Sequence, residues 1–264
     1  MNENGIYTVN KLSETTFQSD ECGRDICYLL LGEEKALLID CSIGTGDIKS
    51  LVQSLTDLPI IVAATHAHAD HTGAGYMFGE VWVHKAECNL IFRVTNSQIW
   101  RRSLLSNRMK KQGIGSKNIK GRIWQAKWLP FEDGKTFELG ERTVRAVHTP
   151  GHSPGSVVFV DEKEKLMFTG DNTCPVLLMK LPHAVSLEEW LAGAEKTLEL
   201  AKTYEPWCAH GDGRQSCEQI EKKIAAVKEI IEKYPKNSAK HEKVAYPRFS
   251  TEGCVIFDTA KVHK

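Results

Sequence analysis

A short polar cluster at the end of an apolar run constrains the fold of this chain more than any other feature. Residues 66–71 read His-Ala-His-Ala-Asp-His and directly follow the apolar run 59–65, which is typical of a buried strand. Side chains two residues apart on extended backbone point the same way, so His66 and His68 can face one ligand position while Asp70 and His71 face another. Imidazole and carboxylate are ligands that Zn²⁺ and similar metals select. The cluster therefore predicts metal binding at the carboxyl end of a strand.

The remaining apolar patterns predict an α/β protein. Strands are expected before the cluster at 6–9, 27–31 and 35–40, with a helix at 48–55, and strands are expected after it at 143–147, 156–160, 165–169, 206–209 and 254–257. Two later helices are predicted at 187–202, opened by a Ser186/Glu189 capping box, and at 216–234. Strands that alternate with helices, with polar clusters at the strand ends, are typical of α/β folds.

The composition of the chain limits its expected cellular location and its expected binding partners. The 34 Lys and Arg balance the 34 Asp and Glu, which argues against a dedicated nucleic-acid binder. Eight cysteines without a CxxC pair predict reduced thiols rather than a disulfide framework. No apolar run is long enough for a membrane span, and residues 1–4 lack the features of a secretion signal. We therefore expect a cytoplasmic protein.

Further metal-ligating residue types stand at other predicted strand ends. His152 lies in Thr-Pro-Gly-His-Ser-Pro-Gly-Ser (149–156), Asp171 ends Thr-Gly-Asp (169–171), and His210 lies in Cys-Ala-His-Gly (208–211). Asp40 ends the strand 35–40. Glycines beside these residues suit sharp turns that bring backbone close to an ion.

In this order and spacing, the motifs resemble those of the metallo-β-lactamase-fold hydrolases, over about residues 5–234. The resemblance implies an αββα four-layer sandwich with a two-metal site at one edge, formed by a single domain over 1–264. It implies a first metal held by His66, His68 and His152, a second held by Asp70, His71 and His210, and Asp171 bridging both. The expected metal is zinc, with iron and manganese as alternatives. Asp40 is expected to support the metal-binding loops.

The same resemblance implies a chemistry. Two neighbouring cations can lower the pKa of a shared water, and the resulting hydroxide of the dinuclear site attacks an electrophile. Asp70 is the expected proton acceptor. An aspartate at 171 resembles the glyoxalase II, lactonase and nuclease branches rather than true β-lactamases, and His68 in place of a glutamate disfavours the di-iron oxygen reductases.

A basic insert at about 88–130 is predicted to be helical. Residues 91–130 contain ten Lys and Arg, no Asp or Glu, and Trp100, Trp124 and Trp128. One interpretation is an anion clamp, with Arg101 and Arg102 binding a phosphate-bearing carrier such as coenzyme A. The other interpretation is a solvated helical pair whose tryptophans pack on the body. His183, in an apolar loop over 175–183, is a further candidate substrate-binding residue.

The sequence thus predicts a metal-dependent hydrolase acting on a small-molecule thioester or ester, with acyl-CoA-like thioesters among the expected substrates. The alternatives are a lactonase, a nucleic-acid or nucleotide phosphodiesterase, and a non-catalytic metal scaffold. Nucleic acid and membrane partners are not expected, and the sequence predicts no particular oligomeric state.

Overall fold

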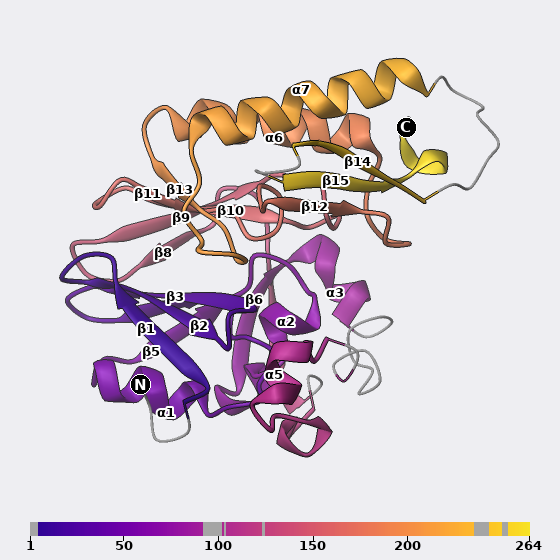
Figure 1. Ribbon diagram of the computed structural model, residues 1–264. Helices are drawn as coiled ribbons and strands as arrows, with labels where there is room; N and C mark the ends of the chain where they lie inside the picture. Colours follow the sequence, from indigo (N-terminus) through magenta and orange to yellow (C-terminus); the bar gives the residue numbers. More distant parts are fainter. Residues whose placement is uncertain (1–4, 92–101, 103, 123–124, 235–242, 250–252) are drawn as a thin grey trace. The chain divides into compact units, whose positions relative to one another are not determined.

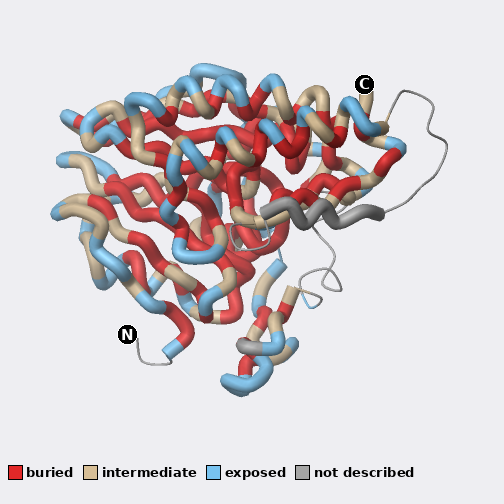
Figure 2. The backbone as a smooth tube through the Cα atoms, turned by 45° about the horizontal axis from the view of Figure 1, so that its top comes forward, coloured by how far each residue is buried: buried red, intermediate tan, exposed pale blue. Residues whose placement is uncertain are grey.

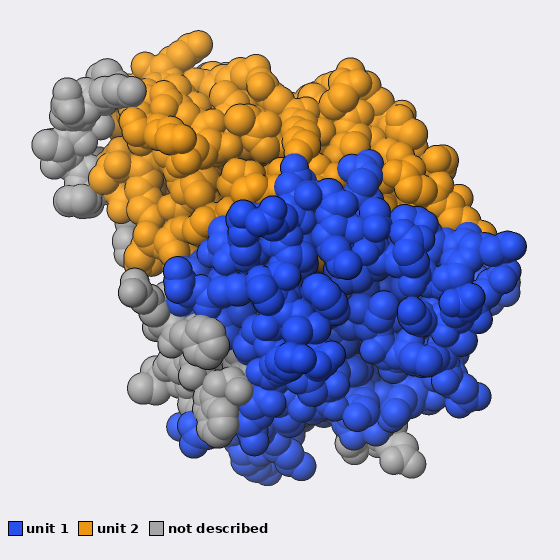
Figure 3. Space-filling view, turned by 180° about the vertical axis from the view of Figure 1, so that it is seen from behind, with its two compact units in different colours: residues 1–145 blue, residues 146–264 orange. Residues whose placement is uncertain are grey.

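The computed structural model describes residues 5–91, 102, 104–122, 125–234, 243–249 and 253–264. The chain divides into two compact units, residues 1–145 and 146–264, which Figure 3 colours separately. Each unit has its own hydrophobic core of buried side chains. The expectation of a single domain over 1–264 stays a prediction.

A seven-stranded sheet forms the body of unit 1. Its strands follow chain order: β1 (Tyr7–Lys11), β2 (Thr16–Glu21), β3 (Asp25–Leu31), β4 (Ala36–Ile39), β5 (Ile60–Ala63), β6 (Glu80–His84) and β7 (Lys127–Phe131). The strands β1 to β4 are antiparallel neighbours, whereas β4 to β7 are parallel. Parallel neighbours need a crossover connection, and α1 (Ile48–Leu55) supplies it between β4 and β5. The carboxyl ends of β4 and β5 therefore lie at the same edge of the sheet.

Helix α1 shows why this crossover forms where the sequence predicts it. The Asp47 side chain accepts a hydrogen bond from the Ser50 amide, which satisfies one free N–H of the first turn. Ile48, Leu51 and Val52 fall at helical spacing and are buried. The loops that follow β4 and β5 are buried at residues 40–45 and 64–68, and Figure 2 colours the backbone by burial.

The insert contains only short helical pieces in its described part. These are α3 (Cys88–Leu90), α5 (Asn107–Lys111) and the 3₁₀ turn η4 (Ser116–Asn118); two further turns, η1 (Gly75–Met77) and η2 (Lys85–Glu87), precede it. The predicted helical range ends too late, because β7 begins at Lys127 and pairs with β6. Trp128 packs against the core of unit 1, as the second interpretation predicts, and Trp100 and Trp124 lie outside the described residues.

Two strands lie at the boundary between the units. The strand β8 (Thr136–Glu138) pairs antiparallel with the first residues of β9 (Thr143–His148), and the boundary falls within β9.

Unit 2 contains a second mixed sheet. The strands β10 (Val157–Asp161) and β11 (Leu166–Phe168) form the predicted hairpin, and β13 (Glu205–Trp207) runs parallel to β11. The strand order is β13-β11-β10-β9. The Thr-Gly-Asp motif directly follows β11, and His210 follows β13, so two neighbouring strand ends deliver Asp171 and His210.

Two long helices and a three-stranded sheet complete unit 2. The helices are α6 (Leu187–Ala201) and α7 (Cys217–Lys233), each opened by a capping box, at Ser186 and Ser216. They contact each other, with an ion pair between Lys228 and Glu195, and run along the small sheet in Figure 1. That sheet has the order β12 (Val176–Met179), β15 (Gly253–Asp258) and β14 (Lys243–Phe249), and the turn η6 (Thr259–Lys261) follows it. Both predicted helices are confirmed to within about a residue at each end.

The structure corrects one local expectation in unit 2. The segment 175–183 is not an apolar loop, because Val176–Met179 form β12 and pair in parallel with β15. Leu177 and Met179 are buried in the core of unit 2, whereas Val176 is 49% exposed. The alternation of burial shows that Leu177 and Met179 face the core of unit 2, whereas Val176 and Leu178 face the other side of the sheet.

No helix in the described part of the chain is long and apolar enough to cross a membrane. All eight cysteines are free thiols, as predicted.

Candidate metal centre

In unit 1, the candidate ligands lie in the turn that follows β5. The strand ends at Ala63, and one turn of helix, α2 (Ala69–Thr72), begins three residues after His66. The amide groups of His71 and Thr72 donate to the His68 carbonyl, which closes this turn. All four candidate ligands, His66, His68, Asp70 and His71, are buried, with Asp70 the most exposed at 8%. Buried imidazoles and a carboxylate in one turn need partners, and a metal ion is the partner that they share most simply.

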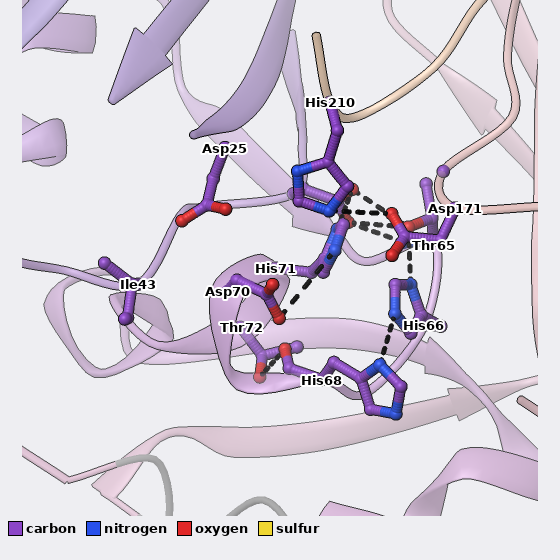
Figure 4. A network of polar contacts seen from close by, with 12 residues as sticks. Asp25, Ile43, Thr65, His66, His68, Asp70, His71, Thr72, Asp171 and His210 are labelled. Atoms are coloured by element: carbon purple, nitrogen blue, oxygen red, sulfur yellow. Dashed lines mark hydrogen bonds and ion pairs between the residues drawn. The ribbon is translucent and has the colours of Figure 1, made fainter. Parts of the chain in front are cut away.

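His66 and His68 direct ring nitrogens toward each other. His66 Nε2 lies 2.9 Å from His68 Nδ1, and Figure 4 marks this contact. Two ligand nitrogens of a tetrahedral zinc site are about 3.3 Å apart, given Zn–N distances of about 2.0 to 2.1 Å. The observed spacing is close to that value. These two nitrogens therefore suit a single metal ion.

Asp40 orients His71 from the neighbouring strand end. Its Oδ2 accepts a hydrogen bond from His71 Nδ1 at 2.8 Å, and its carboxylate also accepts from the Thr65 amide at 2.7 Å and the Thr65 hydroxyl. Because Nδ1 carries the proton, the Nε2 lone pair of His71 is left for a metal ion. The predicted support of the metal-binding loops by Asp40 thus has a direct geometric basis.

Two charged residues around this turn were not singled out from the sequence. Arg24 Nη2 donates to Asp70 Oδ2 at 3.4 Å, and Asp70 Oδ1 lies 3.9 Å from His71 Nε2. The buried Glu87 accepts a hydrogen bond from the Ala67 amide at 2.7 Å, which holds the backbone between the two histidines. Neither residue belongs to a sequence motif, because both reach the turn from other segments of unit 1.

In unit 2, Asp171 lies between two histidines. Its Oδ2 is 3.4 Å from His152 Nε2, and its Oδ1 is 3.2 Å from His210 Nε2. Figure 4 labels Asp171 and His210. A carboxylate with each oxygen facing a different imidazole has the geometry of a group that can bridge two metal positions.

His152 is held in the same way as His71. Its Nδ1 donates to the Leu178 carbonyl at 2.6 Å, which leaves Nε2 facing Asp171. Its amide donates to Asn172 Oδ1 at 2.9 Å. Gly151 is required at this turn because an added Cβ would lie 2.5 Å from Asn172 Oδ1 and 2.6 Å from Trp190.

A buried lysine supports the loop that follows Asp171. Lys223 on α7 is 7% exposed and donates from Nζ to the carbonyls of Thr173, at 2.5 Å, and Cys174. Burial lowers the pKa of Lys223 to about 8, while nearby thiols of cysteine partly oppose this change. A lysine on an amphipathic helix normally faces water, so the sequence contained no signal for this contact.

The candidate substrate-binding residues that the structure describes differ in burial. His183 is partly buried, and burial, with a smaller effect from nearby His152, lowers its pKa to about 4, so it is neutral at pH 7. Arg102 is exposed, and Arg101 lies outside the described residues. Their proposed binding to substrate stays a prediction.

Comparisons with known proteins identify the family. The model of the metallo-β-lactamase superfamily matches residues 26–219. Acyl-coenzyme A thioesterase MBLAC2 from Bos taurus is 29% identical over 188 residues, which cover 66% of this chain and 67% of that protein. Hydroxyacylglutathione hydrolase GloC from Haemophilus influenzae is 28% identical over 154 residues, which cover 55% of this chain and 65% of that protein. The chain belongs to the metallo-β-lactamase superfamily.

A solved structure supports the same fold. A metallo-β-lactamase from Pontibacter korlensis superposes with a TM-score of 0.59 at 15% identity, covering 83% of this chain and 97% of that chain. The predicted family and mixed α/β fold are confirmed, and the chain is a hydrolase of this superfamily rather than a true β-lactamase. The superfamily fold implies a dinuclear site with His and Asp ligands.

Proposed function

We propose that this protein is a metal-dependent thioesterase that hydrolyses acyl thioesters of the coenzyme A class. The supporting observation is that hydrogen bonds orient two of the candidate ligands. Nδ1 of His71 and Nδ1 of His152 each donate to a protein oxygen, so Nε2 of each ring is left for a metal. The similarity to an acyl-coenzyme A thioesterase supports the thioester as the substrate class.

We propose that the seven candidate residues form the ligand set of a dinuclear site. We assign the first metal to His66, His68 and His152, the second to Asp70, His71 and His210, and the bridging position to Asp171. Zinc is the proposed metal because a set of imidazoles and carboxylates is typical of catalytic zinc. When bound, the two ions would activate a water molecule and polarise the thioester carbonyl.

The chain's own groups have separate tasks in this reaction. Asp70 is the proposed proton acceptor, since its Oδ1 faces His71 while Arg24 holds its Oδ2. Asp40 and the Leu178 carbonyl hold His71 and His152 in one tautomer and orientation, so the ligands need little reorganisation. No serine or cysteine nucleophile is required.

The free thiols suit a reducing compartment, which supports the proposed cytoplasmic location. The substrate is a small molecule in this proposal.

The test is a substrate panel with metal analysis. Protein loaded with zinc is assayed with an acyl-CoA, a lactone and an aryl phosphodiester, with and without a chelator. We expect chelator-sensitive hydrolysis of the thioester and two metal equivalents, which fall toward one in Asp171→Asn and stay at two in the exposed control Asp212→Asn. Preferential turnover of the lactone or the phosphodiester would reject the thioesterase assignment in favour of that alternative.

A further inference from the structure

Unit 1 contains a cavity that is separate from the turn carrying the candidate metal ligands. A cavity of about 770 Å³ lies between segment 44–50, which leads into α1, and segment 112–120 of the basic insert. Its volume falls in the range of about 300 to 1,000 Å³ that is usual for small-molecule sites. None of the predicted site residues lines it.

The cavity carries a net positive charge. Lys49, Lys117 and Lys120 line it, against a single carboxylate, Asp47. The amide and hydroxyl of Ser50 donate to Asp47, and these hydrogen bonds lower the pKa of its carboxyl. Lys49 and Lys117 form no ion pair with any residue in the described ranges. The lining therefore has about two positive charges in excess at neutral pH, and an anionic ligand would be attracted.

One wall of this cavity is held rigidly by a buried carboxylate. Glu21 is fully buried, and its Oε1 accepts from the Thr45 amide at 2.8 Å and the Thr45 hydroxyl at 2.6 Å, while Oε2 accepts from the Ile43 amide at 3.1 Å. The Tyr7 hydroxyl also donates to Glu21 Oε1. Charged acceptors with several donors make strong hydrogen bonds, so segment 43–46 is preorganised.

Apolar and aromatic side chains complete the lining. Ile6 and Ile114 are buried side chains of the cavity wall, and Tyr76 contributes an aromatic ring. A cavity that combines ammonium groups with an aromatic ring and apolar surface fits a ligand with both phosphates and a heterocyclic base.

The cavity adjoins the segments that carry candidate ligands. The Cys41 amide donates to the His71 carbonyl at 2.7 Å, and the Ala74 amide donates to the Ser42 carbonyl. Gly73 permits this contact, since an added Cβ would lie 2.3 Å from the Ile43 carbonyl oxygen. Segment 41–46 and the turn 71–77 are thus joined directly, and both continue into the cavity lining at residues 44–50 and at Tyr76.

We propose that this cavity binds the phosphorylated nucleotide end of a small thioester carrier of the coenzyme A class. The proposal rests on the proposed thioesterase function. It assigns carrier recognition to Lys49, Lys117 and Lys120, so the basic insert acts through Lys117 and Lys120. A concave site of this volume suits a small nucleotide better than the convex surface of a carrier protein.

Direct binding tests the cavity independently of catalysis. Adenosine 3′,5′-bisphosphate is titrated calorimetrically into the whole protein, into the double variant Lys117→Glu/Lys120→Glu, and into the matched control Lys110→Glu/Lys111→Glu. The control lysines are exposed on the same insert and do not line the cavity. We expect at least a tenfold loss of affinity in the cavity variant and less than a threefold loss in the control. Equal losses in both variants, or no binding to the unmodified protein, would overturn the proposal.

Kinetics then separate this proposal from the proposed function. The cavity variant should show about a tenfold higher KM for acyl-CoA with unchanged kcat, and unchanged kinetics with acyl-pantetheine, which lacks the nucleotide. Absence of hydrolysis of either thioester, with selective loss of bisphosphate binding, would reject the thioesterase and leave the cavity assignment in place. Hydrolysis of acyl carrier protein thioesters but not of acyl-CoA would overturn the small-carrier proposal.

Discussion

The buried ammonium group of Lys223 makes the stability of this protein depend on alkaline pH in a defined way. Its pKa is lowered from 10.5 to about 8, and desolvation on burial is the largest cause. Below pH 8 the lysine is charged in both the folded and the unfolded chain, so the cost of burying the charge is fully present. Between about pH 8 and 10.5 the folded chain loses this proton while the unfolded chain keeps it. The free energy of unfolding should therefore rise with pH in this window.

The size of this effect follows from the two pKa values. The slope for one proton is about 1.4 kcal/mol per pH unit, so the full window corresponds to about 3 kcal/mol. Replacement of Lys223 by methionine removes this cost but also removes the donor for the Thr173 and Cys174 carbonyls, which costs about 1 to 3 kcal/mol. The two changes nearly cancel at pH 7. The informative quantity is hence the pH dependence and not the stability at one pH.

Urea unfolding in the presence of a chelator and a thiol reductant measures this dependence from pH 7 to 10.5. We compare the unmodified protein with Lys223→Met at each pH, so that titrating groups that do not interact with Lys223 cancel. The thiols of Cys174 and Cys208 do interact with Lys223 and contribute to the difference. The control is Lys228→Met, whose lysine lies on the same helix, is about half exposed and pairs with Glu195. We expect the advantage of the unmodified protein over Lys223→Met to grow by about 3 kcal/mol, and its advantage over Lys228→Met to stay constant. Parallel curves for the unmodified protein and Lys223→Met would refute the reasoning.

Three further predictions concern other buried polar groups. Arg142→Met should lower the free energy of unfolding, measured in urea, by about 3 kcal/mol. Arg142 is 2% exposed, and its guanidinium donates to two backbone carbonyls of unit 1, which would lose their donor. Glu21→Gln should cost about 2 kcal/mol in the same assay, since an amide NH₂ would face backbone donors; unchanged stability would contradict this. Asp40→Asn should weaken metal binding 10- to 100-fold in competition with a chelating dye, because His71 loses its orienting acceptor, whereas the exposed control Asp57→Asn should not.

The helices of unit 2 show how much of the fold local signals predict. A capping box acts within four residues, so Ser186 and Ser216 mark the starts of α6 and α7 in the sequence itself. Apolar periodicity likewise predicts α1, β3 and β4. Strand β2 was missed because its residues are largely polar, although Gln18, Ser19 and Glu21 are buried. Their partners, such as Thr45 for Glu21, come from other segments, so no local pattern could reveal the strand.

The candidate metal centre likewise has a part that the sequence predicts and a part that it does not. The types and order of its ligands are visible in the sequence because 66–71 directly follow a strand and because motifs recur at later strand ends. The groups that orient those ligands are not visible. Asp40 reaches His71 across the edge of the sheet, the Leu178 carbonyl that accepts from His152 belongs to a strand predicted as a loop, and Arg24 lies in no motif.

The sequence by itself determined the class of the protein through the order and spacing of its motifs. It also determined the positions of the main helices and the seven candidate ligands, because each capping box and each motif depends on neighbours a few residues apart. Only the tertiary structure decided which ring nitrogen each orienting contact leaves for a metal, which lysine is buried, and which cations of the basic insert share a cavity with segment 44–50. Those properties arise from contacts between segments that folding alone brings together, and their energies depend on burial rather than on residue type.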